Sequence, residues 1–279
     1  MLIDENLCRL CLVYSRSKDL IAFNRGSELP KLLRYIADLL DRKGSRTEIF
    51  AESYNYVKML ADFPDPYIYM KKQLTEIGKK VAEKVRRYLA ERNWDLHEAI
   101  KISAAANIID TSVIGYEPIE LDKAIWDRPA IDEYTEIPKD KKIVIVLDNA
   151  GEAEIDFILA ETLVRNGYNI AIAVRKEPYE IDIAYHDIAD RVADLNVEII
   201  TTPSNISPVA HLKDCFAIIK GIANLESNIE MGMVESLHLF RAKCEVLTKI
   251  FNIPKNSPII ITGKVLKNLF LGFVEKCFC

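Results

Sequence analysis

The stretch K-K-I-V-I-V-L-D-N-A-G-E-A-E-I-D, residues 141–156, decides the expected fold of this chain. Its first half is an unbroken aliphatic run, which is typical of a strand buried on both faces of a parallel sheet. The run ends in the carboxylate of Asp148 and the amide of Asn149, at the edge where open α/β sheets bind their ligands. Glu152 and Asp156 follow on the first turns of a predicted helix. The segment therefore predicts an α/β sheet with acidic and amide groups beside one strand.

Two interpretations of Asp148 and Asn149 are open from this segment alone. Oxygen donors at this density suit a hard divalent cation such as Mg²⁺ or Mn²⁺. Alternatively, Asp148 only caps the N-terminus of the following helix. The polar residues at the other strand ends distinguish between a metal site and a helix cap.

Strands and helices alternate from Lys141 onward. Further strands are predicted at residues 170–174, 197–201, 216–219 and 259–262, with helix-period apolar residues between them. This repetition is typical of a three-layer αβα fold with a mainly parallel, Rossmann-like sheet. If all strands point the same way, polar groups collect at one edge. In strand order these groups are Asp148, Asn149 and Glu152; Arg175, Glu180, Asp182 and Asp187; Thr201, Thr202 and Ser204; Lys220, Gly221, Asn224 and Glu226; and Gly263 and Lys264.

The N-terminal half has a different spacing of apolar residues, which is typical of helices. Apolar residues recur every three or four positions, for example along the charged amphipathic stretch 69–92. The linker I-P-K-D at residues 137–140 then precedes the first strand. We therefore predict a helical domain at residues 1–137 and an α/β metal- and phosphate-binding domain at residues 138–279.

Composition excludes several classes of partner. The net charge of −5 argues against a surface for nucleic acid or anionic membranes, but it allows a small basic pocket for phosphate. No apolar run approaches the roughly 20 residues that cross a bilayer, and the first residues lack the hydrophobic core of a signal peptide. We expect a cytoplasmic protein that binds neither nucleic acid nor membrane. The oligomeric state stays open.

Six cysteines are spread along the chain, and two of them form C-x-x-C at Cys8 and Cys11. No second C-x-x-C or histidine pair stands at zinc-finger spacing, so we expect thiols and not a disulfide framework. The two cysteines share one face of a predicted helix. A buried structural pair and a metal or redox site are both open.

Lys220 and Gly221 supply the expected phosphate site. A lysine at a strand end, followed by backbone amides that enter a helix, can receive phosphate oxygens. Glycine at position 221 lets the backbone approach the ligand closely. The alternative is that Lys220 is an ordinary surface lysine.

Three short motifs follow one another along this sheet edge. D-N-x-x-E begins at Asp148, V-R-x-x-P begins at Val174 and is followed by Asp182, and K-G-x-x-N begins at Lys220. With these motifs in this order, the chain resembles the metal-dependent damage-control phosphatases, known as domain-of-unknown-function family 89, and most of all their archaeal members. The resemblance spans most of the chain. It implies a helical N-terminal domain before the α/β domain.

The resemblance also implies a role for each matched residue. Asp148, Asn149 and Asp182 would be the metal ligands, and Lys220 would bind phosphate and act in catalysis with Asp148 and Asn149. The substrate pocket would be lined by Glu152, Arg175, Lys220, Gly221 and Asn224, and Asp156 matches a later family aspartate.

Three further acidic or amide residues are candidates for the site. Family members often have Asn before the position of Asp182, whereas this chain has Ile181, so Asp187 is an alternative third ligand. Asn107 and Asp110 either reach the site from the helical half or cap a helix end.

The leading hypothesis is metal-dependent hydrolysis of small phosphomonoesters, such as sugar phosphates or damaged metabolites, with Mn²⁺, Co²⁺, Ni²⁺ or Mg²⁺. Ala150 stands where the D-x-D phosphatases have their second acid, which favours water over Asp148 as the nucleophile. An S-adenosylmethionine-dependent methyltransferase is an alternative, but no G-x-G-x-x-G occurs. A metal-dependent sugar-phosphate-binding protein without catalysis is another alternative.

Overall fold

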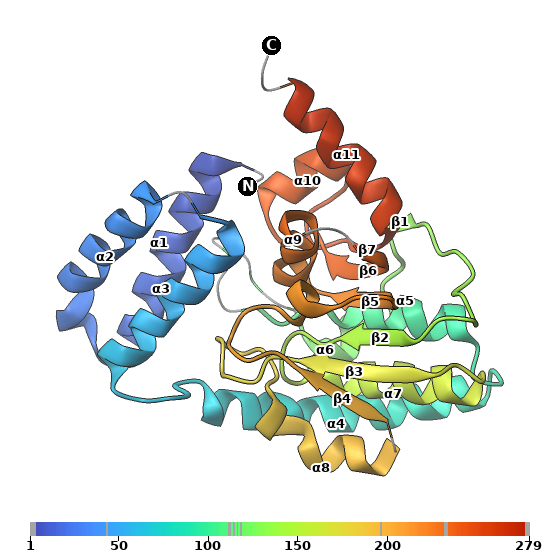
Figure 1. Ribbon diagram of the computed structural model, residues 1–279. Coiled ribbons are helices and arrows are strands. Elements are labelled where there is room, and N and C mark those ends of the chain that lie inside the picture. The colour runs from blue at the N-terminus through green and yellow to red at the C-terminus, as the bar shows by residue number, and fades with distance from the viewer. Residues whose placement is uncertain are drawn as a thin grey trace.

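A computed structural model describes residues 4–276 except 43, 111, 112, 114, 116, 118, 196, 232 and 233. Within these residues one sheet forms the centre of the molecule, in the order β1-β7-β6-β5-β2-β3-β4 (Figure 1). The strands are β1 (Ile131–Asp132), β2 (Ile143–Val146), β3 (Ile170–Val174), β4 (Glu198–Thr201), β5 (Phe216–Lys220), β6 (Glu235–Arg241) and β7 (Pro258–Thr262). All neighbours are parallel except β6 and β7. The predicted mainly parallel α/β fold is confirmed.

Two strands, β1 and β6, were not predicted. The β6 segment E-S-L-H-L-F-R mixes polar with aliphatic residues, so it lacks the continuous run that marks a buried parallel strand. It lies between β5 and β7 and runs antiparallel to β7. The carboxyl end of β7 therefore lies at the opposite edge of the sheet. The expectation that Gly263 and Lys264 join the other strand ends is wrong.

Helices cover both faces of the sheet and also form a separate layer (Figure 1). They are α1 (Glu5–Ala22), α2 (Leu29–Asp41), α3 (Arg46–Ala61), α4 (Ile68–Ala90), α5 (Leu96–Ala106), α6 (Leu121–Ala124), α7 (Glu152–Arg165), α8 (Tyr185–Leu195), α9 (Ile222–Glu230), α10 (Glu245–Phe251) and α11 (Gly263–Lys276). Residues of α4, α5, α7 and α8 share a core with Ile143 and Ile145 of β2. The intervening residues of β2, β3 and β5 face the other way and pack with Val209, Leu212 and Cys215, while residues of β6 and β7 pack with α9 to α11. This alternation is the period of a strand buried on both faces.

The helices α1 to α3 form a separate core beside the sheet. This helical layer packs on Tyr179 and Ile181, which follow β3, and it therefore lies over the carboxyl edge of the sheet. In contrast, α4 and α5 pack on α7 and the sheet, although they precede residue 138. The division into domains at residues 137 and 138 stays a prediction.

Helix α4 also touches the loop that follows β2. A Cβ on Gly78 would lie only 2.1 Å from the carbonyl oxygen of Gly151. Residue 78 therefore has to be glycine for α4 to pack this closely against the loop. Within the described residues, no helix is both long and apolar enough to span a membrane.

Candidate metal centre

The chain leaves β2 at the point where the strand order reverses. It crosses to β3 on one side, and the later strand β5 pairs with β2 on the other side. Open α/β sheets bind ligands at such switch points. The loops after β2 and β5 meet there, because a Cβ on Gly221, which has φ 76°, would lie 2.0 Å from Oδ2 of Asp148. Only glycine allows this approach.

Two amide side chains hold the Asp148 carboxylate. Asn107 Nδ2 donates to Asp148 Oδ2 at 3.0 Å and to Glu152 Oε2 at 2.8 Å. Asn149 Nδ2 donates to Asp148 Oδ2 at 3.1 Å, to Glu152 Oε1 at 2.7 Å and to the carbonyl oxygen of Ile109 at 2.9 Å. Three acceptors therefore fix the amide of Asn149, and its Oδ1 is the atom that is left for a cation.

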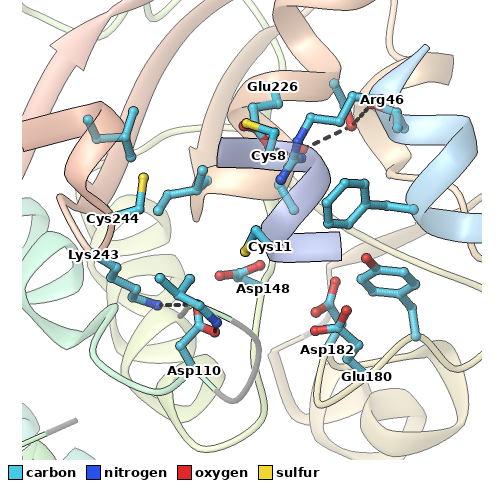
Figure 2. A pocket seen from close by; sticks show the side chains of 18 of the residues that line it. Cys8, Cys11, Arg46, Asp110, Asp148, Glu180, Asp182, Glu226, Lys243 and Cys244 are labelled. Atoms are coloured by element: carbon cyan, nitrogen blue, oxygen red, sulfur yellow. Dashed lines mark hydrogen bonds and ion pairs between the residues drawn. The ribbon is translucent and has the colours of Figure 1, made fainter. Parts of the chain in front are cut away.

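Backbone pairing brings the second acid to the same place. Asn149 and Asp182 form an isolated antiparallel bridge. The N–H of Ile183 donates to the Asp148 carbonyl oxygen at 2.8 Å, and the N–H of Ala150 donates to the Ile181 carbonyl oxygen at 2.9 Å. Asp148 and Asp182 thus line one cavity, although they come from different loops (Figure 2).

The charge at this point is mostly negative. Burial raises the pKa of Asp148 well above its usual range, and the neighbouring Asp182 and Glu152 add to the effect. Burial likewise raises the pKa of Asp182, although Arg175 Nε donates to its Oδ2 at 2.6 Å and opposes this. Burial raises the pKa of Glu152 to about 7. A divalent cation would relieve this crowding, so the oxygen donors fit a hard metal.

The cavity has a volume of about 250 Å³ and lies between the sheet edge and the helical layer (Figure 2). The sheet side contributes Asp110, Asp148, Asn149, Asp182 and the cations Arg175 and Lys243. The helical layer contributes apolar side chains, two thiols and Arg46, which pairs with Glu226 of α9. Residues of both halves of the chain therefore line the cavity.

Lys220 is fully buried beneath this cavity and is not among its lining residues. Its Nζ lies 3.0 Å from Asp156 Oδ1 and donates to Ser103, whose Oγ is 2.8 Å away. The Ser103 hydroxyl in turn donates to Asp156 at 2.6 Å. In this structure the ammonium group therefore neutralises Asp156. Its predicted contact with phosphate stays a prediction.

Two of the other predicted pocket residues, Glu152 and Asn224, are also buried and do not line the cavity, whereas Arg175 lines it. Asn224 Nδ2 donates to the carbonyl oxygens of Leu147, at 3.1 Å, and Lys220, at 2.9 Å. Its Oδ1 accepts a hydrogen bond from Ser207 at 2.7 Å. Asn224 thus ties β2 to β5, while Glu152 and Asn107 orient Asp148 from below. Contacts of these residues with substrate stay predictions.

Asp187 lies in a separate group with Asp65 and His186, whose candidate ligand atoms are all within 4.8 Å of one another. Lys71 Nζ already lies between the carboxylates, 2.6 Å from Asp65 and 2.8 Å from Asp187. This ammonium group occupies the position that a cation would need. Asp182 lines the cavity and Asp187 does not, and the identity of the third ligand stays a prediction.

Three basic residues at or near the site, Lys243, Arg46 and Arg16, were not predicted from the sequence. Lys243 lines the cavity, and its Nζ donates to the Ile109 carbonyl oxygen at 3.0 Å and to Asp110 Oδ2 at 3.3 Å. It follows β6, so recognising that strand would have pointed to it. Arg16 is fully buried in α1 and pairs with Asp19 and Glu180. No local motif marks it.

The sequence of the chain also matches a known protein family. The profile of the damage-control phosphatase ARMT1-like domain matches residues 14–259. The chain belongs to this family. Membership supports a phosphatase role and a small phosphorylated metabolite as substrate.

Individual relatives come from archaea. The family member named damage-control phosphatase PH1575, of Pyrococcus horikoshii, is 27% identical over 236 residues, which are 77% of this chain and 79% of the relative. A damage-control phosphatase of Archaeoglobus fulgidus is 22% identical over 238 residues, or 78% and 82% of the two chains. The crystal structure of PH1575, described as a DUF89 family protein, matches with a TM-score of 0.74 and 22% identity. It covers 91% of this chain and 97% of that one. The structural match shows that the fold is shared.

Proposed function

We propose that this family member is a metal-dependent phosphatase that hydrolyses small phosphomonoesters, such as sugar phosphates or damaged phosphorylated metabolites. The observation that carries the proposal is that Asp148, Asn149 and Asp182 line one buried cavity. Two carboxylates and an amide oxygen can hold a divalent cation and leave coordination sites open for substrate. We propose Mn²⁺, Co²⁺, Ni²⁺ or Mg²⁺ as that cation.

A bound divalent cation supplies Lewis-acid polarisation of a phosphoryl oxygen. The chain supplies the positioning. Arg175 and Lys243, both lining the cavity, are the cations that can face the remaining phosphate oxygens. Lys220 would join them if its ammonium group left Asp156 when the anionic substrate entered. Fixed charges of this kind stabilise a phosphoryl-transfer transition state without rearranging at the moment of reaction.

The cavity also limits the size of the substrate. Its volume of about 250 Å³ suits a small metabolite. Apolar side chains such as Phe50 and Leu247 lie on the wall away from the acids. We therefore expect the phosphate at the sheet edge and the carbon skeleton towards the helical layer.

The decisive experiment measures phosphate release from a panel of small phosphoesters with each of the four cations. Asp148→Asn and Asp182→Asn should each lower kcat/KM by more than about 100-fold, because each removes a charged ligand at almost constant volume. The matched control is Asp187→Asn, which should stay within about threefold of the unaltered protein.

Three outcomes would contradict the proposal. Loss of activity in Asp187→Asn alone would move the third ligand to Asp187. Ligand-induced thermal stabilisation with no phosphate release would favour the sugar-phosphate-binding alternative. Calorimetric binding of S-adenosylmethionine would favour the methyltransferase.

A further inference from the structure

Three cysteines from distant parts of the chain line the same cavity. Cys8 and Cys11 lie on α1, and Cys244 follows β6 at the start of α10 (Figure 2). All three are thiols. Cys244 is more than 230 residues away from the other two in sequence, so only the packing of the helical layer against the sheet edge brings it to them. A fourth described thiol, Cys215, lies elsewhere, in the core beneath β5.

The thiols and the oxygen ligands differ in chemistry. Asp148, Asn149 and Asp182 offer hard oxygen donors, which select cations such as Mg²⁺ and Mn²⁺. Thiolate sulfur is soft and selects Zn²⁺, Cd²⁺ or Cu⁺. The cavity therefore presents two donor sets of opposite preference, one on the sheet edge and one on the wall formed by α1 and the β6–α10 loop.

We propose that Cys8, Cys11 and Cys244 form a second metal site, which binds one soft cation of the Zn²⁺ class. This site goes beyond the proposed phosphatase function and does not depend on it. Three protein sulfur ligands leave the fourth tetrahedral position for a solute. As each metal–sulfur bond forms, the S–H bond of that cysteine breaks and its proton leaves to solvent.

Side-chain rotation is needed to close the site. No group of three ligand atoms that includes these thiols lies within 4.8 Å in the described part of the chain. Cys8 and Cys11 are three residues apart on one helix and so share a face. Cys244 has an extended backbone, with φ −114° and ψ 158°. Rotation about χ1 moves each sulfur between staggered positions without moving the backbone.

Burial works against the thiolate form at two of the cysteines, because it raises the pKa of the Cys244 thiol as well as that of the Cys8 thiol. At Cys8 the charge of Arg46 opposes this rise in pKa. A soft cation competes with the proton for the same sulfur, so binding should strengthen as the pH rises. Arg46 is itself held by Glu226 of α9 and lies over the ring of Phe50. The positive charge beside Cys8 is thus fixed in place.

The experiment titrates the reduced, metal-free, full-length protein with Cd²⁺ and follows the ultraviolet charge-transfer band of cadmium–thiolate bonds. We expect saturation at about one equivalent, since three thiols make one site. Cys8→Ser, Cys11→Ser and Cys244→Ser should each weaken binding by at least about tenfold. Two variants are controls and should bind Cd²⁺ normally: Cys215→Ser, which removes the thiol outside the cavity, and Asp148→Asn, which removes the hard ligand.

The outcomes separate this site from the phosphatase site. Absence of the band, or equal loss in Cys215→Ser, would overturn the proposal. Loss of the band in Asp148→Asn would also overturn it, because the thiolate-bound Cd²⁺ would then depend on a ligand of the proposed phosphatase site. Thermal unfolding without Cd²⁺ checks that each serine variant is folded, and Cd²⁺ should raise the Tm of the unaltered protein but not that of Cys244→Ser. None of these measurements needs phosphatase activity.

Discussion

The two acids of the proposed metal centre are held in place by different means. Asp148 is held by neutral groups: the amides of Asn107 and Asn149 and the close backbone of Gly221. Asp182 is held by charge: it pairs with Arg175, and its loop is braced by Arg16 of α1. Arg16 reaches that loop from 163 residues away in sequence, at Tyr179. One acid belongs to the sheet and the other depends on the helical layer.

The difference shows how a site between two layers can be rigid on one side and dependent on docking on the other. The sheet side is fixed as soon as β2 and β5 pair, because Asp148 and Gly221 follow directly from these strands. The helix side is fixed only when α1 buries Arg16 against Glu180, a residue held at a positive φ of 45°. We therefore expect mutations on the helix side to cost stability and mutations on the sheet side to cost metal affinity.

The largest effect is expected for Arg16→Met, which breaks the helix side. Arg16 donates to Asp19 at 2.6 Å, to Ser53 at 3.0 Å and to Tyr179 at 3.1 Å, and it is fully buried. Removing it leaves buried carboxylates unpaired, which costs about 3–5 kcal/mol of unfolding free energy. Guanidinium unfolding measures this loss.

The matched control for that variant is Arg9→Met on the same helix. Arg9 pairs with Glu5 at the surface, where ion pairs contribute little. Equal destabilisation by both substitutions would mean that α1 is held by its apolar face alone. The charge of Arg16 would then not be what holds the helix side.

The next effect is expected for Gly221→Ala on the sheet side. The new Cβ would meet Oδ2 of Asp148 at 2.0 Å, so the carboxylate has to move. We expect Mn²⁺ affinity, measured by calorimetry, to fall by about 10–100-fold. Gly167→Ala is the control, since Gly167 has a similar φ of 80° and no atom within 4 Å of its would-be Cβ. Equal loss in both variants would assign the effect to backbone strain and not to Asp148.

The sheet side is also the part that sequence reasoning predicted well. Aliphatic runs locate β2, β3 and β5 because a strand buried on both faces has a local signature. Asp148, Asn149 and Gly221 follow from those strand ends. Their meeting at one edge needs only that the strands are parallel.

The helix side and the far strands could not be predicted in the same way. Arg16 sits in mid-helix, and its partner Glu180 is fixed only by tertiary packing. Ser236 and His238 interrupt the apolar residues of β6, so it lacks the unbroken run that marks β2, β3 and β5, and neither β6 nor the reversal of β7 was predicted. Lys220 was predicted as a phosphate ligand. In the structure it pairs with Asp156, which also accepts a hydrogen bond from Ser103 of α5, and the sequence could not place Ser103 nearby.

The smallest effect is expected from acid, and it should reach the sheet side through His238 of β6. Burial lowers the pKa of His238 to about 3, against roughly 6.5 in an unfolded chain. Asn228 Nδ2 lies 3.1 Å from its Nε2, in keeping with a neutral ring that accepts there. In the unfolded chain His238 therefore binds a proton below about pH 6.5, whereas in the folded protein it does so only near pH 3. This contribution to stability is complete above pH 6.5 and is lost as the pH falls towards 3.

Lowering the pH from about 7.5 to about 5.5 should thus cost on the order of 1 kcal/mol through this residue. His238→Gln removes the titrating group, so its unfolding free energy should fall less steeply over that range than that of the unaltered protein. His211→Gln, at an exposed position, is the control and should keep the full slope. The segment from α1 to α3 contains no histidine, so this contribution belongs to the sheet side. An unchanged slope in His238→Gln would place the acid sensitivity in groups other than His238.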